Sequence, residues 1–357
     1  MKIIFSGGGT LGPVTPLLAI KEIIKESHKD AEFVWAVTKR GPERELVEEA
    51  GVRFVILSSG KFRRYFSLWN IVDIFRIIIG YFQSFKILWK ESPDVCISAG
   101  GFISVPLHWA AWLLGIPTWI HQQDIRVGLA NKLMAPFAKV ITTSLEQNLK
   151  DYPKKKTTWL GNPVRNEILI GDKKYAQELF KLKKDLPVVF ATGGGTGSLR
   201  VNQLVVEAVD HLKGFAQVIH LSGKERPQEL VARAVDLYQD YQVHQFFTEE
   251  MKDAYAVSDI VVSRGGFGTL TEIAALGKVA VIIPKPGHQV DNVHFLEKAG
   301  AAIFVNERTS DGLYLAKVIR EILENSVKQK QLVHNLQKML PVAQKKDVLS
   351  IIDRLIK

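Results

Sequence analysis

Cysteine is almost absent from this chain, which has a single one, Cys96, among its 357 residues. One thiol cannot form an internal disulfide, and it cannot supply the cysteine ligands of a zinc or iron–sulfur site. The sequence therefore predicts a protein of a reducing compartment. Long apolar runs are lacking as well, because no uncharged stretch reaches the ~18 residues of a membrane-spanning helix. The apolar residues that follow Met1 end at Ser6 and Gly7, which is too short a run for a signal peptide and indicates a first strand.

Three motifs of catalysis or metal binding are missing. The sequence contains no Asp-x-Asp, no His-Glu-x-x-His and no Gly-x-Ser-x-Gly. The first absence disfavours the metal–diphosphate site of many single-domain glycosyltransferases, and the other two disfavour metalloprotease and α/β-hydrolase chemistry. We therefore expect no metal site.

Acidic residues are outnumbered, with 37 Asp and Glu against 47 Lys and Arg, so that the net charge is +10. Residues 1–160 carry most of this excess. A basic half points to an anionic partner, and both nucleic acid and an anionic membrane are candidates on this ground alone.

Short, β-branched, apolar runs alternate with helical stretches along the whole sequence. Strands that are apolar on both faces are typical of parallel sheets covered by helices on each side. Their regular alternation with helices predicts α/β, doubly wound sheets. We expect strands at residues 2–6, 33–37, 53–57, 95–98, 118–121, 139–143, 157–160, 188–192, 217–221, 243–247, 260–263, 279–283 and 302–305.

A weak internal repeat indicates two domains. The apolar strand and glycine turn of residues 3–10 are similar to residues 188–196, and two such openings predict two Rossmann-like domains in tandem. We place the domains at residues 1–162 and 163–341. The tail, residues 342–357, has the apolar spacing of an amphipathic helix that must dock on another part of the fold.

Residues 61–90 combine basic and aromatic side chains, with six Lys or Arg against one acidic residue. One interpretation is a pair of ordinary helices that cover the sheet. The other is a membrane-surface segment, with basic groups for lipid phosphates and aromatic rings at headgroup depth. Single-stranded nucleic acid is a third candidate for such a mixture, but no RNP, KH or helix-turn-helix signature supports it.

The turn Gly7–Gly12 fits the pattern G-x-G-x-x-G, whose glycines allow close approach of backbone to phosphate at a helix N-terminus. Binding of NAD would require an acidic residue after the second strand, where the sequence has Thr38-Lys39-Arg40 instead. NAD is therefore disfavoured, whereas NADP and a turn without a ligand both stay open. The second turn, Gly193–Ser198, lacks the lysine of a Walker A motif but could line a diphosphate with its N–H groups.

The segment Ser263–Glu272 joins a strand to a helix and contains Arg264 and three glycines. The arginine and the helix N-terminus together make an anion site. Thr269-x-x-Glu272 has the spacing of a capping box, and the same carboxylate could instead accept the hydroxyls of a ribose. Local pattern alone favours the cap.

Polar side chains follow two further strands. Residues 284–292 form a loop at the carboxyl end of a parallel strand, where ligands bind, although plain turn chemistry also explains them. His121 to Asp124 end another strand, and Ser98–Ser104 is a glycine turn at the same sheet edge. A buried, hydrogen-bonded histidine is the structural alternative for His121.

These motifs, in this order, resemble the MurG family, the UDP-N-acetylglucosamine:N-acetylmuramyl-(pentapeptide) pyrophosphoryl-undecaprenol N-acetylglucosamine transferases of peptidoglycan synthesis. The resemblance spans nearly the whole chain. It is strongest at residues 161–165, 222–224, 271–275 and 289–292, and continues in register through 296–302. It implies the GT-B fold, two Rossmann-like domains facing across a cleft, with the C-terminal helix 342–357 returning to the first domain.

The resemblance also implies a function and its residues. The enzyme would be an inverting, metal-independent and cofactor-free transferase that moves GlcNAc from UDP-GlcNAc to undecaprenyl-diphosphate-MurNAc-pentapeptide, converting lipid I to lipid II. The second domain would hold UDP-GlcNAc, with Glu272 on the ribose and Phe247 on the uracil. The acceptor loop would be Thr10, Leu11 and Gly12. The remaining implied binding residues are Asp124, Arg165, Gly195, Arg264, Phe267, Gly268, Thr269, Leu270, Thr271, Gln289 and Asn292.

Two departures from the family pattern affect the acceptor side. Leu11 and Pro13 replace a glycine and a histidine of the family's first loop, and Gln122 and Asp124 stand where the family has glutamate and asparagine. Since Pro13 cannot act as a base, His121 and Asp124 are the catalytic candidates.

The resemblance favours the membrane interpretation of residues 61–90 and disfavours nucleic acid. The protein would then lie peripherally at the cytoplasmic face of the plasma membrane. Three alternatives remain open: a related transferase with another lipid or glycoside acceptor, a UDP-GlcNAc 2-epimerase, and an NADP-binding protein.

Overall fold

The computed structural model describes residues 1–60, 69–195, 197–224, 226–247 and 249–356. The first part of the aromatic and basic segment, residues 61–68, lies outside the described residues, as does Thr196 of the second glycine turn. The contacts divide the chain into two compact units. Unit 1 comprises Met1–Arg165 and Val342–Lys357, and unit 2 comprises Asn166–Pro341.

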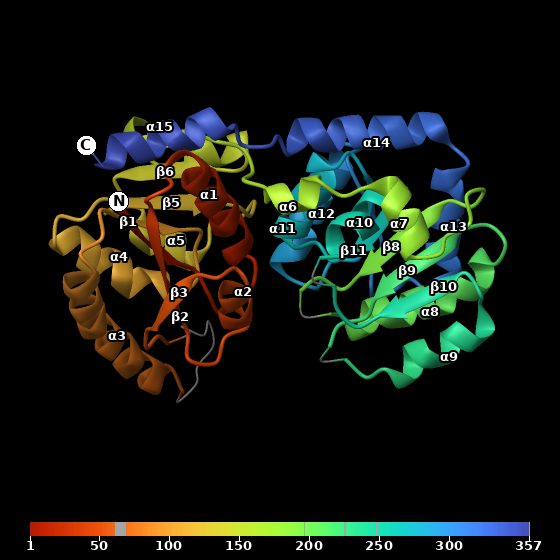
Figure 1. The fold of residues 1–357 in the computed structure, drawn as a ribbon, viewed down its shortest axis with the longest axis horizontal. Helices are drawn as coiled ribbons and strands as arrows, with labels where there is room; N and C mark the ends of the chain where they lie inside the picture. The colour runs from red at the N-terminus through yellow and green to blue at the C-terminus, as the bar shows by residue number, and fades with distance from the viewer. Residues whose placement is uncertain (61–68, 196, 225, 248, 357) are drawn as a thin grey trace. The chain divides into compact units, whose positions relative to one another are not determined.

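Unit 1 is built on a parallel sheet with the strand order β3-β2-β1-β4-β5-β6-β7 among the described residues (Figure 1). Its strands are β1 (Lys2–Ser6), β2 (Glu32–Val37), β3 (Arg53–Ile56), β4 (Val95–Ser98), β5 (Thr118–Gln122), β6 (Val140–Thr143) and β7 (Thr157–Trp159). Its helices are α1 (Val14–Ser27), α2 (Glu43–Glu49), α3 (Trp69–Glu91), α4 (Ser104–Leu113), α5 (Leu129–Met134) and α15 (Lys345–Ile356), with 3-10 turns at Glu146–Asp151 and Lys154–Lys156.

Alternate residues of β1 point into two separate cores of unit 1. Ile3 and Phe5 are buried with apolar residues of α1 and α15, whereas Ile4 is buried with residues of α3 and α4. This explains why the strand is apolar on both faces, since helices cover each side of the sheet.

The C-terminal helix α15 packs on α1 in unit 1. Its buried residues are Val348, Ile351, Ile352 and Leu355, which lie on one face because they recur at helical spacing. Lys345 Nζ forms an ion pair with Glu26 of α1 at 2.8 Å, and Nε2 of His28, which follows α1, lies 3.3 Å from Asp353.

Unit 2 repeats the architecture with the order β10-β9-β8-β11-β12-β13, again parallel and counted over the described residues. Its strands are β8 (Val188–Thr192), β9 (Gln217–Leu221), β10 (Tyr241–His244), β11 (Ile260–Ser263), β12 (Val279–Ile282) and β13 (Ile303–Phe304). Its helices are α6 (Asn166–Leu169), α7 (Lys173–Leu179), α8 (Leu199–Leu212), α9 (Glu229–Leu237), α10 (Met251–Val257), α11 (Phe267–Ala275), α12 (His288–Lys298), α13 (Gly312–Leu323) and α14 (Ser326–Met339).

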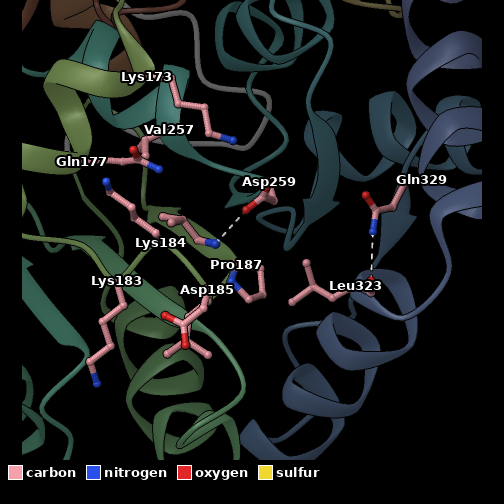
Figure 2. A pocket seen from close by; sticks show the side chains of 12 residues that line it. Lys173, Gln177, Lys183, Lys184, Asp185, Pro187, Val257, Asp259, Leu323 and Gln329 are labelled. Atoms are coloured by element: carbon pink, nitrogen blue, oxygen red, sulfur yellow. Dashed lines mark hydrogen bonds between the residues drawn. The ribbon is translucent and has the colours of Figure 1, made fainter.

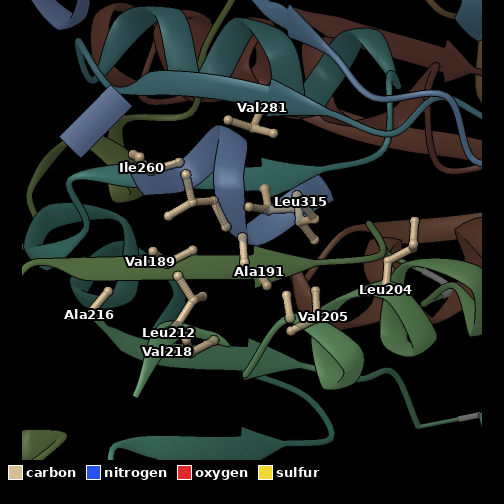
Figure 3. Packing of buried hydrophobic residues seen from close by; sticks show 14 of the residues in the cluster. Val189, Ala191, Leu204, Val205, Leu212, Ala216, Val218, Ile260, Val281 and Leu315 are labelled. Carbon is tan, nitrogen blue, oxygen red and sulfur yellow. The ribbon is translucent and has the colours of Figure 1, made fainter. Parts of the chain in front are cut away.

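Figure 3 shows a hydrophobic core of unit 2, where Val189 and Ala191 of β8 meet Leu204 and Val205 of α8 and Leu315 of α13. Together the two sheets confirm the prediction of two parallel α/β domains. They also place all the loops that leave β8, β11 and β12 at one edge of the unit 2 sheet, because parallel strands share a direction.

Every predicted strand is present, and the largest displacement is at β10. We expected residues 243–247, but pairing to β9 ends where His244 lies opposite Leu221. Phe247 is buried by ring packing instead of by the sheet, and so its apolar character is misleading as a strand signal. Its ring centroid lies 5.6 Å from that of Phe180 and 4.8 Å from that of His244.

Candidate functional site

The two glycine turns of unit 1 meet at the point where the strand order reverses, between β1 and β4. A Cβ atom at Gly101 would lie 2.7 Å from the carbonyl oxygen of Gly8, so the two turns touch through their backbones. Gly101 has a φ of 94°, which only glycine adopts readily. This contact leaves Thr10 and Gly12 exposed at the outer part of the first loop. Ligands of doubly wound sheets bind at this position.

His121 lies inside unit 1, on β5, with none of its side chain exposed. Its Nδ1 lies 2.8 Å from Thr142 Oγ1, and its Nε2 lies 2.9 Å from Ser144 Oγ. Thr142 Oγ1 also accepts a hydrogen bond from Trp119 Nε1, and a neutral ring donates at one of its two nitrogens and accepts at the other. Burial lowers the pKa of His121 to about 3. The ring is therefore neutral, and neither nitrogen is open to a ligand.

Gln122, one residue further, connects four groups at the end of β5. Its Oε1 accepts hydrogen bonds from Asn131 Nδ2 at 2.7 Å and from Tyr152 Oη at 2.9 Å. Its Nε2 donates to the carbonyl oxygens of Asp124 at 2.7 Å and Arg126 at 3.2 Å. A glutamate, which the family resemblance implies here, could not donate to these carbonyls. Gln122 thereby holds the loop that carries the half-buried Asp124.

In unit 2 the loops after β8 and β9 interlock at the carboxyl edge. Gly197 and Gly223 both have positive φ, 66° and 93°. A Cβ at Gly223 would lie 2.7 Å from Gly197 Cα, and one at Gly197 would lie 2.7 Å from the carbonyl oxygen of Ser222. The first loop keeps Gly195 exposed, and Ser198 caps the helix α8 that follows.

Helix α11 begins at Phe267 with Gly266 at its N-cap, and no side chain caps it. Thr269 therefore lies inside the first turn, so the capping-box interpretation of Thr269 and Glu272 is wrong. Glu272 instead lies within hydrogen-bond distance of Tyr255 Oη, at 3.3 Å, and is 8% exposed. The first N–H groups of the helix have no partner inside it, which makes this end suited to an anion.

Three residues of this helix that we expected to bind the donor are buried. Leu270 is fully buried, and its N–H donates to the Gly266 carbonyl oxygen at 3.1 Å. Thr271 is buried, with its Oγ1 2.7 Å from the Gly268 carbonyl oxygen. The side chain of Phe267 is buried as well. Gly268 and Thr269 are half-buried and remain the accessible positions.

Arg264, Gln289 and Asn292 gather around the same loop. The Arg264 guanidinium pairs with Glu307 at 2.5 Å and donates to the Ile283 carbonyl oxygen at 2.9 Å. Asn292 Nδ2 lies 3.4 Å from the Gly265 carbonyl oxygen, and Gln289 Oε1 accepts from the Lys285 N–H at 2.9 Å. The carboxyl ends of β11 and β12 thus bring together a cation, two amides and a helix N-terminus.

Two further expected residues are Phe247 and Arg165. Phe247 has a buried ring that packs against Phe180, Phe190 and His244. Arg165 is half-buried and ends the first stretch of unit 1.

The pocket in Figure 2, of about 310 Å³, lies at the other end of the unit 2 strands. It is lined by Val188 at the start of β8, by Asp259 just before β11 and by Lys173, Lys183 and Lys184. None of the expected site residues lines this pocket. This pocket therefore does not mark the candidate site.

Helix α3 presents apolar side chains to solvent. Phe75, Phe82 and Trp89 are 62%, 67% and 83% exposed, and Ile78 and Ile79 are about half exposed. Among the residues described, no helix combines the length and apolar character needed to cross a bilayer.

Sequence reasoning missed three groups that the structure places at these loops. Glu43 bonds the loops after β1 and β2, Glu307 pairs with Arg264, and Tyr255 reaches Glu272. An acidic residue at a helix start, such as Glu43 at the start of α2, is ordinary, and nothing local distinguishes it. Each pairing joins residues that are distant in sequence.

Two domain families match the chain. Residues 3–143 match the glycosyltransferase family 28 N-terminal domain, and residues 188–353 match the glycosyltransferase family 28 C-terminal domain.

Curated relatives of similar length carry one name, UDP-N-acetylglucosamine--N-acetylmuramyl-(pentapeptide) pyrophosphoryl-undecaprenol N-acetylglucosamine transferase. The protein of Clostridium botulinum is 34% identical over 329 residues, which cover 91% of each chain. The protein of Shouchella clausii is 36% identical over 326 residues, which cover 90% of each chain.

Solved structures share the fold. MurG of Acinetobacter baumannii superposes with a TM-score of 0.72 at 24% identity and covers 99% of both chains. A UDP-GlcNAc 2-epimerase of Neisseria meningitidis bound to UDP-GlcNAc reaches a TM-score of 0.70 at 13% identity, covering 99% of this chain and 100% of the other. Transferases and epimerases therefore share this fold, and the fold alone does not separate the two activities.

Proposed function

Because this chain belongs to glycosyltransferase family 28, whose N- and C-terminal domains both match it, we propose that it transfers N-acetylglucosamine from UDP-N-acetylglucosamine to N-acetylmuramyl-(pentapeptide) pyrophosphoryl-undecaprenol. The observation that carries the proposal is the identity of 34% and 36% to transferases of that name, which extends over about nine-tenths of both chains. The reaction is a step of peptidoglycan synthesis, and its product is lipid II.

Unit 2 binds the donor in this proposal. Glu272 accepts the ribose hydroxyls, supported by its position one turn into α11 and by the exclusion of the capping role. The helix end at Gly268 and Thr269, together with Arg264 and the exposed Gly195, meets the diphosphate, whose charge the N–H groups and guanidinium balance. Gln289 and Asn292, which lie beside the same loop, contact the sugar. Phe247 meets the uracil through its backbone.

The acceptor binds to unit 1 at Thr10, Leu11 and Gly12, and Asp124 is the general base. The acceptor hydroxyl gives its proton to the Asp124 carboxylate as its oxygen bonds to the anomeric carbon, while the bond from that carbon to the diphosphate breaks and UDP leaves. His121 has a structural role and not a catalytic one, since both nitrogens of its ring already take part in hydrogen bonds within the protein. Preorganised donors stabilise the negative charge that develops on the leaving diphosphate, and in many enzymes such stabilisation contributes more to the rate than any other effect.

The exposed face of α3 binds an anionic membrane surface. Its aromatic and aliphatic side chains suit the depth of lipid headgroups. Arg76, Lys86 and Lys90 on the same helix suit lipid phosphates. This contact would hold the enzyme peripherally at the cytoplasmic face, where a polyprenyl acceptor resides.

The test is transfer of labelled N-acetylglucosamine to a short-chain analogue of the polyprenyl-diphosphate acceptor. We expect a disaccharide-lipid product from the wild type and from Lys330→Gln, an exposed control outside the site. Asp124→Asn should lower kcat by at least about a hundredfold. If UDP-N-acetylglucosamine binds and no lipid product forms, the lipid acceptor is wrong. Formation of UDP-N-acetylmannosamine would instead identify an epimerase, the second activity found on this fold.

A further inference from the structure

Glu43 is a fully buried carboxylate at the edge of unit 1 where the acceptor is proposed to bind. Its Oε1 accepts hydrogen bonds from the N–H of Thr38, at 2.8 Å, and from the Thr38 hydroxyl. Its Oε2 accepts from the N–H of Gly9 at 3.1 Å. Thr38 follows β2 and Gly9 follows β1, so that one side chain ties together two loops at the carboxyl edge of the sheet.

The carboxylate occupies the inner part of the first glycine turn. A Cβ at Gly8 would lie 2.6 Å from Glu43 Oε1, and a Cβ at Gly9 would collide with the ring of Phe102. In dinucleotide-binding Rossmann domains, the N–H groups of this turn meet a phosphate. Here the N–H of Gly9 already has a negatively charged partner from the chain itself, and a phosphate at the same place would be repelled.

The corresponding turn of unit 2 is held differently. There the N–H of Gly194 is bonded to the neutral hydroxyl of Thr192, at 3.1 Å. Within the described part of that turn, 193–195 and 197–198, the hydrogen bonds found involve no carboxylate. The two turns look alike in sequence and differ in charge, which leaves the unit 2 turn suited to a diphosphate.

We propose that Glu43 is the positioning residue of the acceptor loop, holding Gly7–Gly12 from within by taking the place that a phosphate takes in dinucleotide-binding domains. The acceptor diphosphate then meets the outer residues Thr10, Leu11 and Gly12, and not the inner N–H groups. This inference rests on the proposed function, because it assumes that this loop binds the acceptor. A carboxylate at this place also disfavours NADP at the turn, in spite of the basic residues after β2.

Glu43→Gln tests the proposal with little change of shape. All three groups around the carboxylate are donors, and an amide nitrogen cannot accept from any of them. The loop should loosen, so that the KM for the lipid acceptor rises at least about tenfold, because small displacements of binding groups lower rates strongly. The KM for UDP-N-acetylglucosamine should change less than about twofold. Glu43→Asp, which keeps the charge, should recover part of the loss, and Glu49→Gln on the exposed side of α2 is the matched control.

Amide hydrogen exchange gives a readout that does not depend on turnover. In Glu43→Gln, exchange of residues 7–13 should accelerate by at least about tenfold, while exchange of residues 193–195 stays unchanged. Equal rises in both KM values, or unchanged exchange at residues 7–13, would overturn the proposal. A wild type that shows no transfer, with the exchange effect still present in Glu43→Gln, would overturn the proposed acceptor and leave the loop-holding role of Glu43 supported.

Discussion

Replacement of His121 by glutamine separates a structural role of this residue from a catalytic one. His121 is fully buried, and burial lowers its pKa from 6.5 to about 3. The folded state therefore keeps the ring neutral at pH values where the unfolded chain binds a proton. Above pH 6.5 neither state is protonated, so His121 contributes no pH dependence there. Below it, the unfolded state gains a proton that the folded state lacks, and stability falls by about 1.4 kcal/mol per pH unit.

The magnitude at pH 4.5, two units below the unfolded pKa, is about 2.7 kcal/mol lost by the wild type through this residue. Glutamine cannot titrate, so His121→Gln escapes that loss. It should cost about 1–3 kcal/mol at pH 7.5, because one hydroxyl partner, on Thr142 or Ser144, loses part of its hydrogen bonding. The stability difference between wild type and variant should therefore shrink or reverse on going from pH 7.5 to pH 4.5.

The measurement is urea unfolding of both proteins at pH 7.5, 6.0, 5.0 and 4.5, followed by circular dichroism, with transfer kinetics at pH 7.5. His334→Gln, on the exposed side of α14, is the matched control and should show the pH dependence of the wild type. The kcat of His121→Gln should stay within about fivefold of the wild type, because no ring nitrogen is open to a ligand. A stability difference that does not change with pH refutes the buried neutral histidine. A thousandfold loss of kcat with normal stability refutes the structural role.

Three further predictions concern the donor loops and the exposed face of α3. Gly197→Ala should lower the affinity for UDP, measured by calorimetry, by at least about tenfold. The φ of 66° at this residue strains any side chain, and the new Cβ would meet the Ser222 carbonyl oxygen. Normal affinity would show that this loop does not shape the site. Glu272→Gln should weaken UDP binding about 10–100-fold, which corresponds to the free energy of a hydrogen bond to a charged group. The binding of 2′,3′-dideoxy-UDP should not change. An equal loss for both nucleotides would contradict the ribose role. Phe82→Ser, at a side chain that is 67% exposed, should reduce sedimentation with phosphatidylglycerol vesicles about tenfold while leaving UDP binding intact, and unchanged sedimentation would place the membrane contact elsewhere.

The strands were predictable because they are local. Apolar, β-branched runs and the glycine turns that follow them depend on a few adjacent residues, and parallel sheets require such runs. The error at β10 shows the limit of that signal. Phe247 is apolar because its ring packs on Phe180 and Phe190, and a sequence pattern does not distinguish ring packing from strand pairing.

The chemistry of the candidate site was only partly predictable, for a different reason. The sequence predicted polar groups at loops that the structure brings to one edge of the unit 2 sheet, including Glu272, Arg264 and Asn292. It could not distinguish an open group from one that is already bonded. The capping interpretation of Glu272 was wrong because α11 begins at Phe267, two residues before Thr269. The boundaries of elements are the part of a fold that local sequence pattern specifies least well.

By itself the sequence determined the two parallel α/β domains, the glycine turns at their carboxyl edges and the membership of a glycosyltransferase family. The first two properties follow from short-range spacing and from residue types at each position, whereas the family was indicated by the resemblance of the motifs to those of a known family. Only the tertiary structure decided that His121 is buried and neutral, that Gln122 holds the loop of Asp124, and that Glu43 fills the first glycine turn. The physical reason is that strand order brings their partners to them: β5 lies beside β6, which supplies Thr142, and β2, whose loop leads to Glu43, lies beside β1, whose loop supplies Gly9. A hydrogen bond between residues that are far apart in the chain exists only once the sheet has formed.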